Sequence, residues 1–234
     1  MQLSKRMQKL ASLVTEENRL ADVGTDHGYI PIFLVREGKI PSALAMDINP
    51  GPLARAKEHI ETYGLTTYIK TRLSDGLEKL REDEAESVLI AGMGGILTVR
   101  ILEGGAHCLA SVKELILQPQ SDIHLVRQWL WEHQYRILVE DIVVEDGKYY
   151  PMMKAVPGQD QAYAQEEWYY GRTSLQRTPE VLFGYLEKKY GEMQKIQDRL
   201  LQSAQEGSAR MQEVKKEMGC IVTTIEKIRE GRLI

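Results

Sequence analysis

Short apolar runs alternate with helical patterns over the first two thirds of the chain. The runs have the length of buried strands, and the segments between them repeat apolar residues three and four positions apart. The predicted strands are residues 19–23, 41–47, 67–73, 87–95, 114–119, 136–144 and 148–156. Because strands separated by helices pair in parallel, this order predicts an α/β fold with a seven-stranded, mostly parallel sheet. Glu145-Asp146-Gly147 is a tight-turn sequence, so the last two strands should form an antiparallel hairpin.

The same pattern predicts the helices that cover the sheet. A leading helix at residues 3–14 gathers Leu3, Met7, Leu10 and Val14 on one face, with Lys5, Arg6 and Lys9 on others. Further helices are predicted after Gly28, at residues 49–64, from Leu97, and after Asp122, whose side chain should cap the last of them.

The apolar pattern changes after Pro157-Gly158. Residues 181–200 place apolar side chains at 182, 186, 193, 196 and 200, and residues 211–228 repeat them alternately three and four positions apart. This spacing is typical of a coiled-coil seam, and the break at Glu206-Gly207-Ser208 predicts an antiparallel helical hairpin. We therefore expect a first domain at residues 1–159 and a second, helical domain at residues 160–234.

Composition narrows the compartment and the class of protein. The 234 residues are 43% hydrophobic and 27% charged, with a net charge of −4, as expected of a globular chain. The N-terminus lacks the apolar stretch of a secretory signal, and residues 88–99 are too short and glycine-rich to span a bilayer. Two distant cysteines imply neither a disulfide framework nor a metal site. We expect a cytoplasmic protein, monomeric, without metal and away from membranes.

The first strand-to-helix loop carries two acids and two glycines, and it indicates a ligand site. Asp22, Gly24, Asp26 and Gly28 follow the first predicted strand, where a dinucleotide-binding fingerprint would have three glycines. Glycines let the backbone approach a ligand closely, but carboxylates would repel a pyrophosphate. No Arg or Lys lies between Leu20 and Val35 to compensate. A ligand with an ammonium and a sulfonium suits this loop, which favours S-adenosylmethionine over NAD.

The next three strand ends carry further candidate cofactor residues, and ligands of open α/β sheets bind at such ends. The candidates are Asp47, Ile48, Asp75, Gly76, Gly92 and Met93. Asp47 is expected to bind ribose hydroxyls, and Asp75 to accept from an adenine amine. The alternative for Asp75 is a helix N-cap. Seven strands ending in a hairpin are typical of class I methyltransferases rather than dehydrogenases.

The candidate catalytic residues are Asp26, His27 and Tyr29, which should lie where a substrate faces the cofactor. The Asn/Asp-Pro-Pro-aromatic sequence of exocyclic-amine methyltransferases is replaced here by Gly92-Met-Gly-Gly95. A ring nitrogen such as adenine N1 needs positioning more than a strong base. His27 could be a general base or a structural histidine, and Tyr29 could stack on a base or simply face a helix.

Several segments together resemble one family. They are Ala21-Asp-Val-Gly-Thr-Asp-His-Gly-Tyr-Ile-Pro-Ile32, Asp47-Ile-Asn-Pro-Gly-Pro52, Leu73-Ser-Asp-Gly-Leu77, Ile90-Ala-Gly-Met-Gly-Gly95, Leu117-Gln-Pro119 and Tyr170-Gly-Arg172. The chain resembles the bacterial tRNA (adenine(22)-N1)-methyltransferases, the TrmK family, over essentially its whole length. The resemblance implies methyl transfer from S-adenosylmethionine to N1 of an adenine in the D-arm region of tRNA. It also implies a cofactor site at Asp22, Gly24, Asp26, His27, Asp47, Asp75, Gly92 and Met93.

With tRNA as the implied substrate, basic residues become candidate phosphate contacts. They are Arg6, Arg172, Arg177, Lys188, Lys189, Arg199, Lys215 and Lys216. The helical lysines are equally compatible with a solvated surface. Other functions also stay open: a methyltransferase of another RNA or of a small molecule, or a non-catalytic cofactor-binding module whose helices recruit a partner. A dehydrogenase is disfavoured by the acidic loop.

Overall fold

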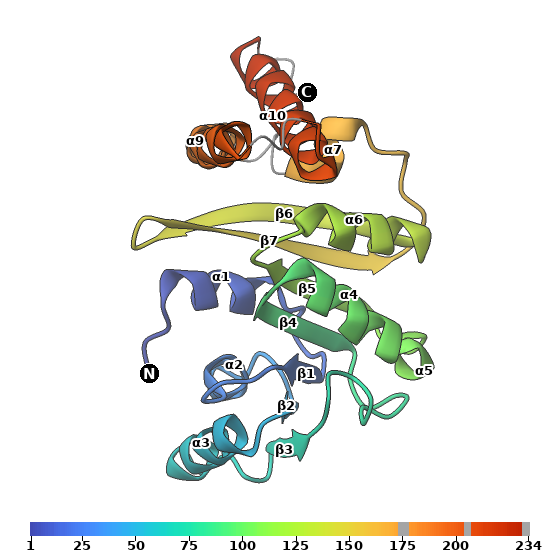
Figure 1. Cartoon of the computed structure of the whole chain (residues 1–234). Coiled ribbons are helices and arrows are strands. Elements are labelled where there is room, and N and C mark those ends of the chain that lie inside the picture. The colour runs from blue at the N-terminus through green and yellow to red at the C-terminus, as the bar shows by residue number, and fades with distance from the viewer. Residues whose placement is uncertain (173–177, 204–206, 231–234) are drawn as a thin grey trace. The chain divides into compact units, whose positions relative to one another are not determined.

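The computed structural model describes residues 1–172, 178–203 and 207–230 (Figure 1). Its sheet has seven strands in the order β3-β2-β1-β4-β5-β7-β6. The strands are β1 (Leu20–Val23), β2 (Ala43–Asp47), β3 (Ile69–Leu73), β4 (Ser87–Met93), β5 (Glu114–Pro119), β6 (Tyr135–Glu145) and β7 (Lys148–Pro157). β1 to β5 pair in parallel, whereas β7 pairs with β5 in the antiparallel direction. The predicted α/β fold with a terminal hairpin is confirmed.

The strand order reverses at β1, which pairs with β2 on one side and with β4 on the other. The chain runs outward from β1 to β2 and β3, and then returns to β4. A reversal of this kind is where open α/β sheets bind their ligands, outside the carboxyl ends of the strands. The loops after β1, β2, β3 and β4 are therefore the part of the fold in which to look for a site.

Six helices cover the two faces of the sheet. They are α1 (Lys5–Leu13), α2 (Tyr29–Arg36), α3 (Pro50–Thr62), α4 (Gly95–Gly104), α5 (Ala106–Leu109) and α6 (Ile123–Glu132). Figure 1 shows the first three on one face and the other three on the opposite face. Side chains between the layers, such as Ile32, Leu34, Leu89 and Ile116, are at most 1% exposed. This burial supplies most of the stabilisation that holds the loops in place.

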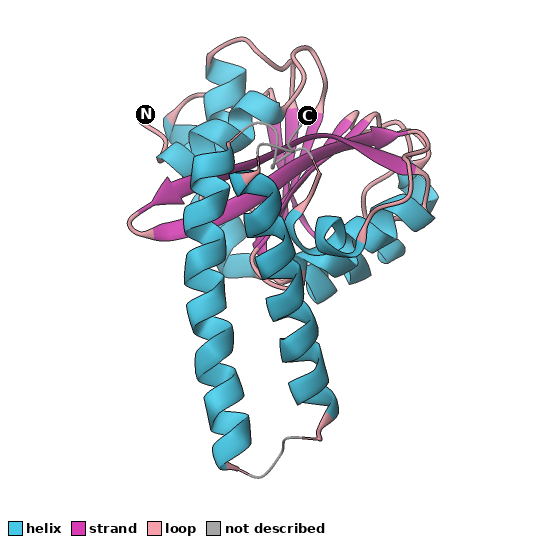
Figure 2. Cartoon of the chain, turned by 90° about the horizontal axis from the view of Figure 1, so that it is seen from above, coloured by secondary structure: helices cyan, strands magenta, loops and turns pink. Residues whose placement is uncertain are grey.

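The chain divides into two compact units. The first comprises residues 1–139 and 143–160, and the second comprises residues 140–142 and 161–234. The second unit contains α7 (Gln165–Tyr170), α9 (Pro179–Gln202) and α10 (Ala209–Arg229), and Figure 2 shows α9 and α10 as two long helices.

The antiparallel hairpin predicted for the second unit is present. Three of its seam residues in α9, Leu182, Leu186 and Met193, are buried, and Met211 and Ile221 are buried in α10. The packed seam explains why these helices form, because tertiary packing stabilises a helix more than propensity does. The sequence did not predict α7, since six residues are too few to display a helical period.

The structure excludes the helix-cap alternative for Asp75, and the predicted side-chain cap at Asp122 is wrong. Residues 76–79 after Asp75 form a turn and no helix, so Asp75 caps nothing. Asp122 does precede α6, but its φ is 50°, and its carboxylate accepts a hydrogen bond from Ser121 Oγ at 2.8 Å instead of capping the helix. The left-handed backbone turns this side chain away from the first helical turn. Within the described ranges, no helix combines the length and the apolarity that crossing a membrane requires.

Candidate functional site

The loop after β1 is bound to the end of β2. The backbone N–H groups of Gly24 and Thr25 both donate to the carbonyl oxygen of Met46, at 2.8 and 2.9 Å. Gly24 has a φ of 75°, which favours glycine. A β-carbon built on Gly24 would lie 2.1 Å from Cε of Met93 at the end of β4. The structure thus brings two predicted cofactor residues, Gly24 and Met93, into contact across the strand-order reversal.

Asp22 is the buried carboxylate of this loop. Its residue is only 8% exposed, and the carboxylate accepts a hydrogen bond from Thr25 Oγ1 at 2.7 Å. Burial is the main cause that raises the pKa of Asp22 from 3.8 to about 6; the hydrogen bond from Thr25 opposes the rise, and the negative charge of Asp47 adds to it. A buried carboxylate at the end of β1 is well suited to pair with a positively charged ligand group, which would compensate its lost hydration.

The raised pKa predicts that stability falls as pH rises. Below about pH 4 both the folded and the unfolded protein hold this proton, and between about pH 4 and 6 only the folded protein does. The free energy of unfolding should therefore decrease by up to about 3 kcal/mol across this window and level off above it. The free energy of unfolding, measured with urea at about pH 4.5 and 6.5, should decrease in the wild type and not in Asp22→Asn. The same change between the two pH values in both proteins would contradict the prediction.

Asp26 is neutralised from another part of the chain. Arg55 on α3 donates from Nη2 to its carboxylate at 2.9 Å and from Nε at 3.3 Å. No Arg or Lys lies close to Asp26 in the sequence, as noted above, but the fold brings Arg55 from α3 to this loop as a compensating cation. The Asp26 side chain is 60% exposed, so this ion pair orients the carboxylate more than it stabilises the fold.

His27, Tyr29 and His59 form a cluster of three rings beside that ion pair. The ring of His27 stacks on Tyr29 with centroids 5.0 Å apart and on His59 with centroids 5.2 Å apart. His59 Nδ1 lies 3.0 Å from the carbonyl oxygen of His27, and since a carbonyl can only accept, His59 is the donor. His27 has a φ of 65°, and its buried Nδ1 has no hydrogen-bond partner among the described residues. The cluster fixes a loop that is strained on its own.

The end of β2 presents a carboxylate and an apolar side chain together. Asp47 Oδ1 accepts a hydrogen bond from the backbone N–H of Asn49 at 2.7 Å, which leaves its other oxygen available. Ile48 is 53% exposed, which is unusual for a large apolar side chain directly after a buried strand. Oxygen acceptors beside an apolar surface are the features that hold a ribose and a flat ring.

Asp75, at the end of β3, is already paired with a cation. Arg100 on α4 approaches its carboxylate at 3.2 Å, and a cavity of about 410 Å³ lies beside the pair. Gly76 has a φ of 54°, and a β-carbon there would lie 2.9 Å from Ile101 on α4. Glycine at this position therefore lets the loop pack closely on α4.

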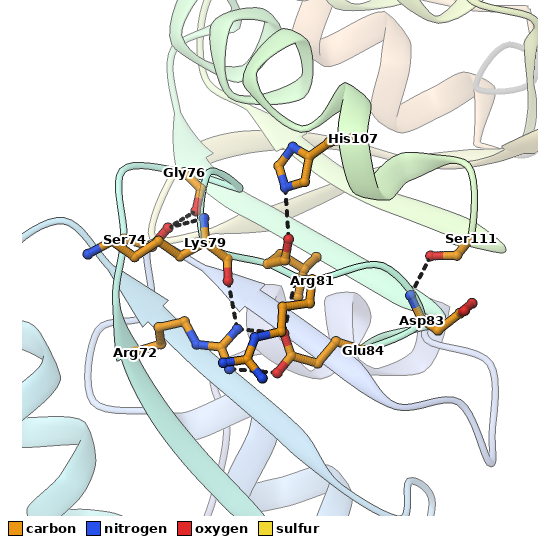
Figure 3. A network of polar contacts seen from close by, with 10 residues as sticks. Arg72, Ser74, Gly76, Lys79, Arg81, Asp83, Glu84, His107 and Ser111 are labelled. Carbon is orange, nitrogen blue, oxygen red and sulfur yellow. Dashed lines mark hydrogen bonds and ion pairs between the residues drawn. The ribbon is translucent and has the colours of Figure 1, made fainter.

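A polar network closes the connection from β3 to β4 (Figure 3). Arg72 donates to both oxygens of Glu84, at 2.5 and 2.6 Å, and to the carbonyl oxygen of Lys79 at 2.8 Å. These bonds hold the pKa of Glu84 down to about 2. Ionised Glu84 therefore stabilises the fold fully above about pH 4.5, and this stabilisation is lost as pH falls towards 2. Most of this change lies below the range of about pH 4 to 6 in which Asp22 affects stability. His107 adds a hydrogen bond to the carbonyl oxygen of Leu80 at 2.8 Å.

Gly28 and Gly92 complete the set of predicted cofactor glycines. Gly28 is the N-cap of α2, with a φ of 67°, and its built β-carbon would contact Ala56 on α3 at 3.5 Å. Gly92 has a φ of 77° and lies at an irregularity in the pairing of β4 with β5. Both positions need the left-handed backbone that glycine adopts readily.

The predicted phosphate contacts of the second unit differ in their surroundings. Arg172 pairs with Glu167 at 2.9 Å and lies over the ring of Tyr163, so its guanidinium is engaged inside its own unit. Lys189 pairs with Glu192 at 3.8 Å. The exposed residues are Lys188, Arg199, Lys215 and Lys216. Arg177 lies outside the described residues.

Comparison with known proteins agrees with this geometry. A family model described as a methyltransferase domain matches residues 3–153. A Bacillus subtilis protein named tRNA (adenine(22)-N(1))-methyltransferase is 40% identical over 164 residues, which are 70% of this chain and 69% of the relative. The chain belongs to the tRNA (adenine(22)-N1)-methyltransferase family.

Solved structures extend this family likeness to both units. The B. subtilis m1A22 tRNA methyltransferase TrmK is 31% identical, with a TM-score of 0.80 over 98% of each chain. The M. capricolum TrmK, solved in complex with the cofactor product S-adenosyl-homocysteine, is 29% identical, with a TM-score of 0.85 over 97% of this chain and 100% of its own. The resemblance inferred from sequence motifs is confirmed.

Sequence reasoning missed the residues that orient the site. They are Arg55, His59, Arg100 and Gln118, and the last of these is 1% exposed at the end of β5. The four-residue spacing of Arg55 and His59 places both on one face of the predicted helix. That spacing indicates that they act together, but it does not identify the loop that they contact.

Proposed function

We propose that this protein transfers a methyl group from S-adenosylmethionine to N1 of adenine 22, in the D-arm region of tRNA. The observation that carries the proposal is the set of carboxylates at three successive strand ends, Asp22, Asp47 and Asp75, around the left-handed Gly24. Membership of the tRNA (adenine(22)-N1)-methyltransferase family supports the substrate.

The residues at the strand ends fit the chemistry of this cofactor. Asp47 accepts hydrogen bonds from the ribose hydroxyls, with Ile48 against the adenine ring. Asp75 accepts from the adenine amine while Arg100 holds its carboxylate in place. Asp22, whose buried carboxylate has no cationic partner among the described residues, faces the ammonium group. Gly24, Gly28, Gly76 and Gly92 supply the left-handed backbone that shapes the loops around the cofactor, and Met93, which Gly24 contacts, borders the reacting end, with Asp26 and His27 on the facing loop.

The chain positions the acceptor more than it activates it. When bound, S-adenosylmethionine supplies a methyl group activated by its sulfonium. The N1 lone pair forms the new N–C bond while the C–S bond breaks and its electrons stay on sulfur. N1-methyladenine is then cationic and can release a proton to water or to a carboxylate. Asp26, His27 and Tyr29 hold the base in line, and their mutual contacts keep the loop rigid.

The two parts of the chain have different tasks in this proposal. Residues 1–159 form the S-adenosylmethionine-binding catalytic domain, and residues 160–234 form the helical domain that binds tRNA. Lys188 and Arg199 on α9, and Lys215 and Lys216 on α10, are exposed basic residues that would contact tRNA phosphates. An adenine within a tRNA stack must also be turned out before its N1 can react, and contacts between the protein and the tRNA must offset the cost of unstacking.

Methyl incorporation tests the proposal directly. Unmodified tRNA transcripts incubated with labelled S-adenosylmethionine should yield 1-methyladenosine on nucleoside analysis, and a transcript with guanosine at position 22 should yield none. Incorporation that persists in the guanosine transcript would move the target to another nucleotide. No incorporation into any RNA, with cofactor binding intact, would favour a non-catalytic cofactor-binding module.

A further inference from the structure

Three arginines from different elements lie beside the strand-end site, and they differ in how their charge is compensated. Arg55 is paired with Asp26, and Arg100 is paired with Asp75. Arg6, on α1, has no carboxylate partner among the described residues. Arg6 is therefore the arginine of the three whose charge is still open to a ligand.

Arg6 is nevertheless held firmly in place. Its Nη1 donates to Oε1 of Gln118 at 3.1 Å, and its Cζ lies 5.2 Å from the centroid of the Tyr150 ring. Gln118 is 1% exposed, so this amide is fixed by the surrounding core at the end of β5. A buried amide and an aromatic face orient a guanidinium without neutralising it.

The guanidinium lies beside Gly92 at the end of β4, next to Met93, which the proposed function places at the reacting end of the cofactor, on the acceptor side of the site. Arg6 Nη1 would lie 3.6 Å from a β-carbon built on Gly92, and Gln120 Nε2 would lie 3.8 Å from the same position. Gly92 therefore leaves open the space in front of these donors. A guanidinium has five N–H donors, and the described structure uses one of them. The remaining donors form a fork that matches an oxyanion.

We infer, resting on the proposed function, that Arg6, oriented by Gln118 and Tyr150, is the oxyanion-binding residue on the acceptor side of the site. The oxyanion is the phosphate of the nucleotide being methylated or the carboxylate of the methionine part of the cofactor. Contact with adenine N1 itself is disfavoured, because N1 becomes positively charged as it is methylated and a guanidinium there would oppose the reaction.

Arg6→Gln separates the two sources of the oxyanion. If Arg6 binds the cofactor carboxylate, calorimetry should show at least about tenfold weaker binding of S-adenosylmethionine, and the variant should bind decarboxylated S-adenosylmethionine as the wild type does. If Arg6 binds phosphate, cofactor affinity should be unchanged. kcat/KM for tRNA at saturating cofactor should then fall at least about tenfold, with a shallower salt dependence.

Two variants and one control distinguish this role from a structural one. Gln118→Met keeps the side-chain volume but removes the hydrogen bond that orients the Arg6 guanidinium. It should therefore cause part of the loss in cofactor affinity or in kcat/KM that Arg6→Gln causes. Arg6→Lys, which keeps the positive charge but not the forked pair of N–H donors, should also show only a partial loss of that affinity or kcat/KM. Lys57→Gln removes one exposed positive charge from α3 and should change neither quantity.

The outcomes remain distinguishable from failure of the proposed function. Turnover of tRNA by the wild type tests the proposed function separately. If turnover is absent, calorimetry still measures cofactor affinity, and a gel shift measures tRNA affinity in place of kcat/KM. The inference is overturned if Arg6→Gln, with its melting temperature preserved, binds cofactor and tRNA as Lys57→Gln does. If Arg6→Gln fails to fold, the same comparison is made with Arg6→Lys.

Discussion

Replacing Asp47 with alanine should weaken the binding of S-adenosylmethionine by about 100-fold and leave the fold intact. Two ribose hydroxyls donating to one carboxylate are worth roughly 3 kcal/mol together, since each hydrogen bond to a charged group contributes about 1.5 kcal/mol or more. Among the described residues, the Asp47 side chain accepts a single hydrogen bond, from the exposed backbone N–H of Asn49, so little folding free energy depends on this carboxylate. Isothermal calorimetry measures the affinity, and a thermal melt without cofactor measures the stability.

Two further variants make the Asp47 result specific. Asp47→Asn keeps an acceptor oxygen but loses the charge, so its affinity should lie between those of the wild type and the alanine variant. Glu61→Ala removes an exposed carboxylate from α3 and should leave affinity unchanged. If Asp47→Ala binds cofactor as tightly as the wild type does, the ribose is held elsewhere and the assignment of this strand end is wrong.

Gly95→Ala should destabilise the protein by about 3 kcal/mol or more, the largest folding effect that we expect from a single methyl group. A β-carbon on Gly95 would lie 2.4 Å from the backbone oxygen of Asp122 and 2.6 Å from that of Ser121. Backbone atoms cannot move aside as a flexible side chain can. The substitution would also strain the hydrogen bond from Gly95 N–H to the Ser121 carbonyl oxygen, which is 2.8 Å long. A melting temperature lower by roughly 6–12 °C is expected for a chain of this size.

Gly104→Ala is the matched control, because Gly104 belongs to the same helix, α4, and has nothing within 4 Å of its built β-carbon. Alanine there should leave stability unchanged or raise it by up to about 1 kcal/mol. Equal melting temperatures for the two variants would show that the turn after β4 can relax. The close contact would then not explain why this position holds glycine.

The order of strands and helices and the acids at the strand ends follow from the sequence alone. Apolar runs of strand length, followed by helical periods, predicted β1 to β7 to within about two residues at most ends. Asp22, Asp47 and Asp75 could be assigned to one edge because parallel strands share the direction of their carboxyl ends. The two long helices of the second unit were equally predictable, since a repeated seam is a local property of the chain.

Only the tertiary structure decided which of these groups are charged, paired or open to a ligand. Asp26 and Arg55 are 29 residues apart, and Arg6 and Gln118 are 112 apart. Such pairs depend on sheet order and on side-chain direction, which a local pattern does not contain. The raised pKa of Asp22 likewise comes from burial beneath a folded loop. Periodicity specifies which residues face the core, whereas the electrostatics of the site arise from long-range packing that places separate elements within hydrogen-bond distance.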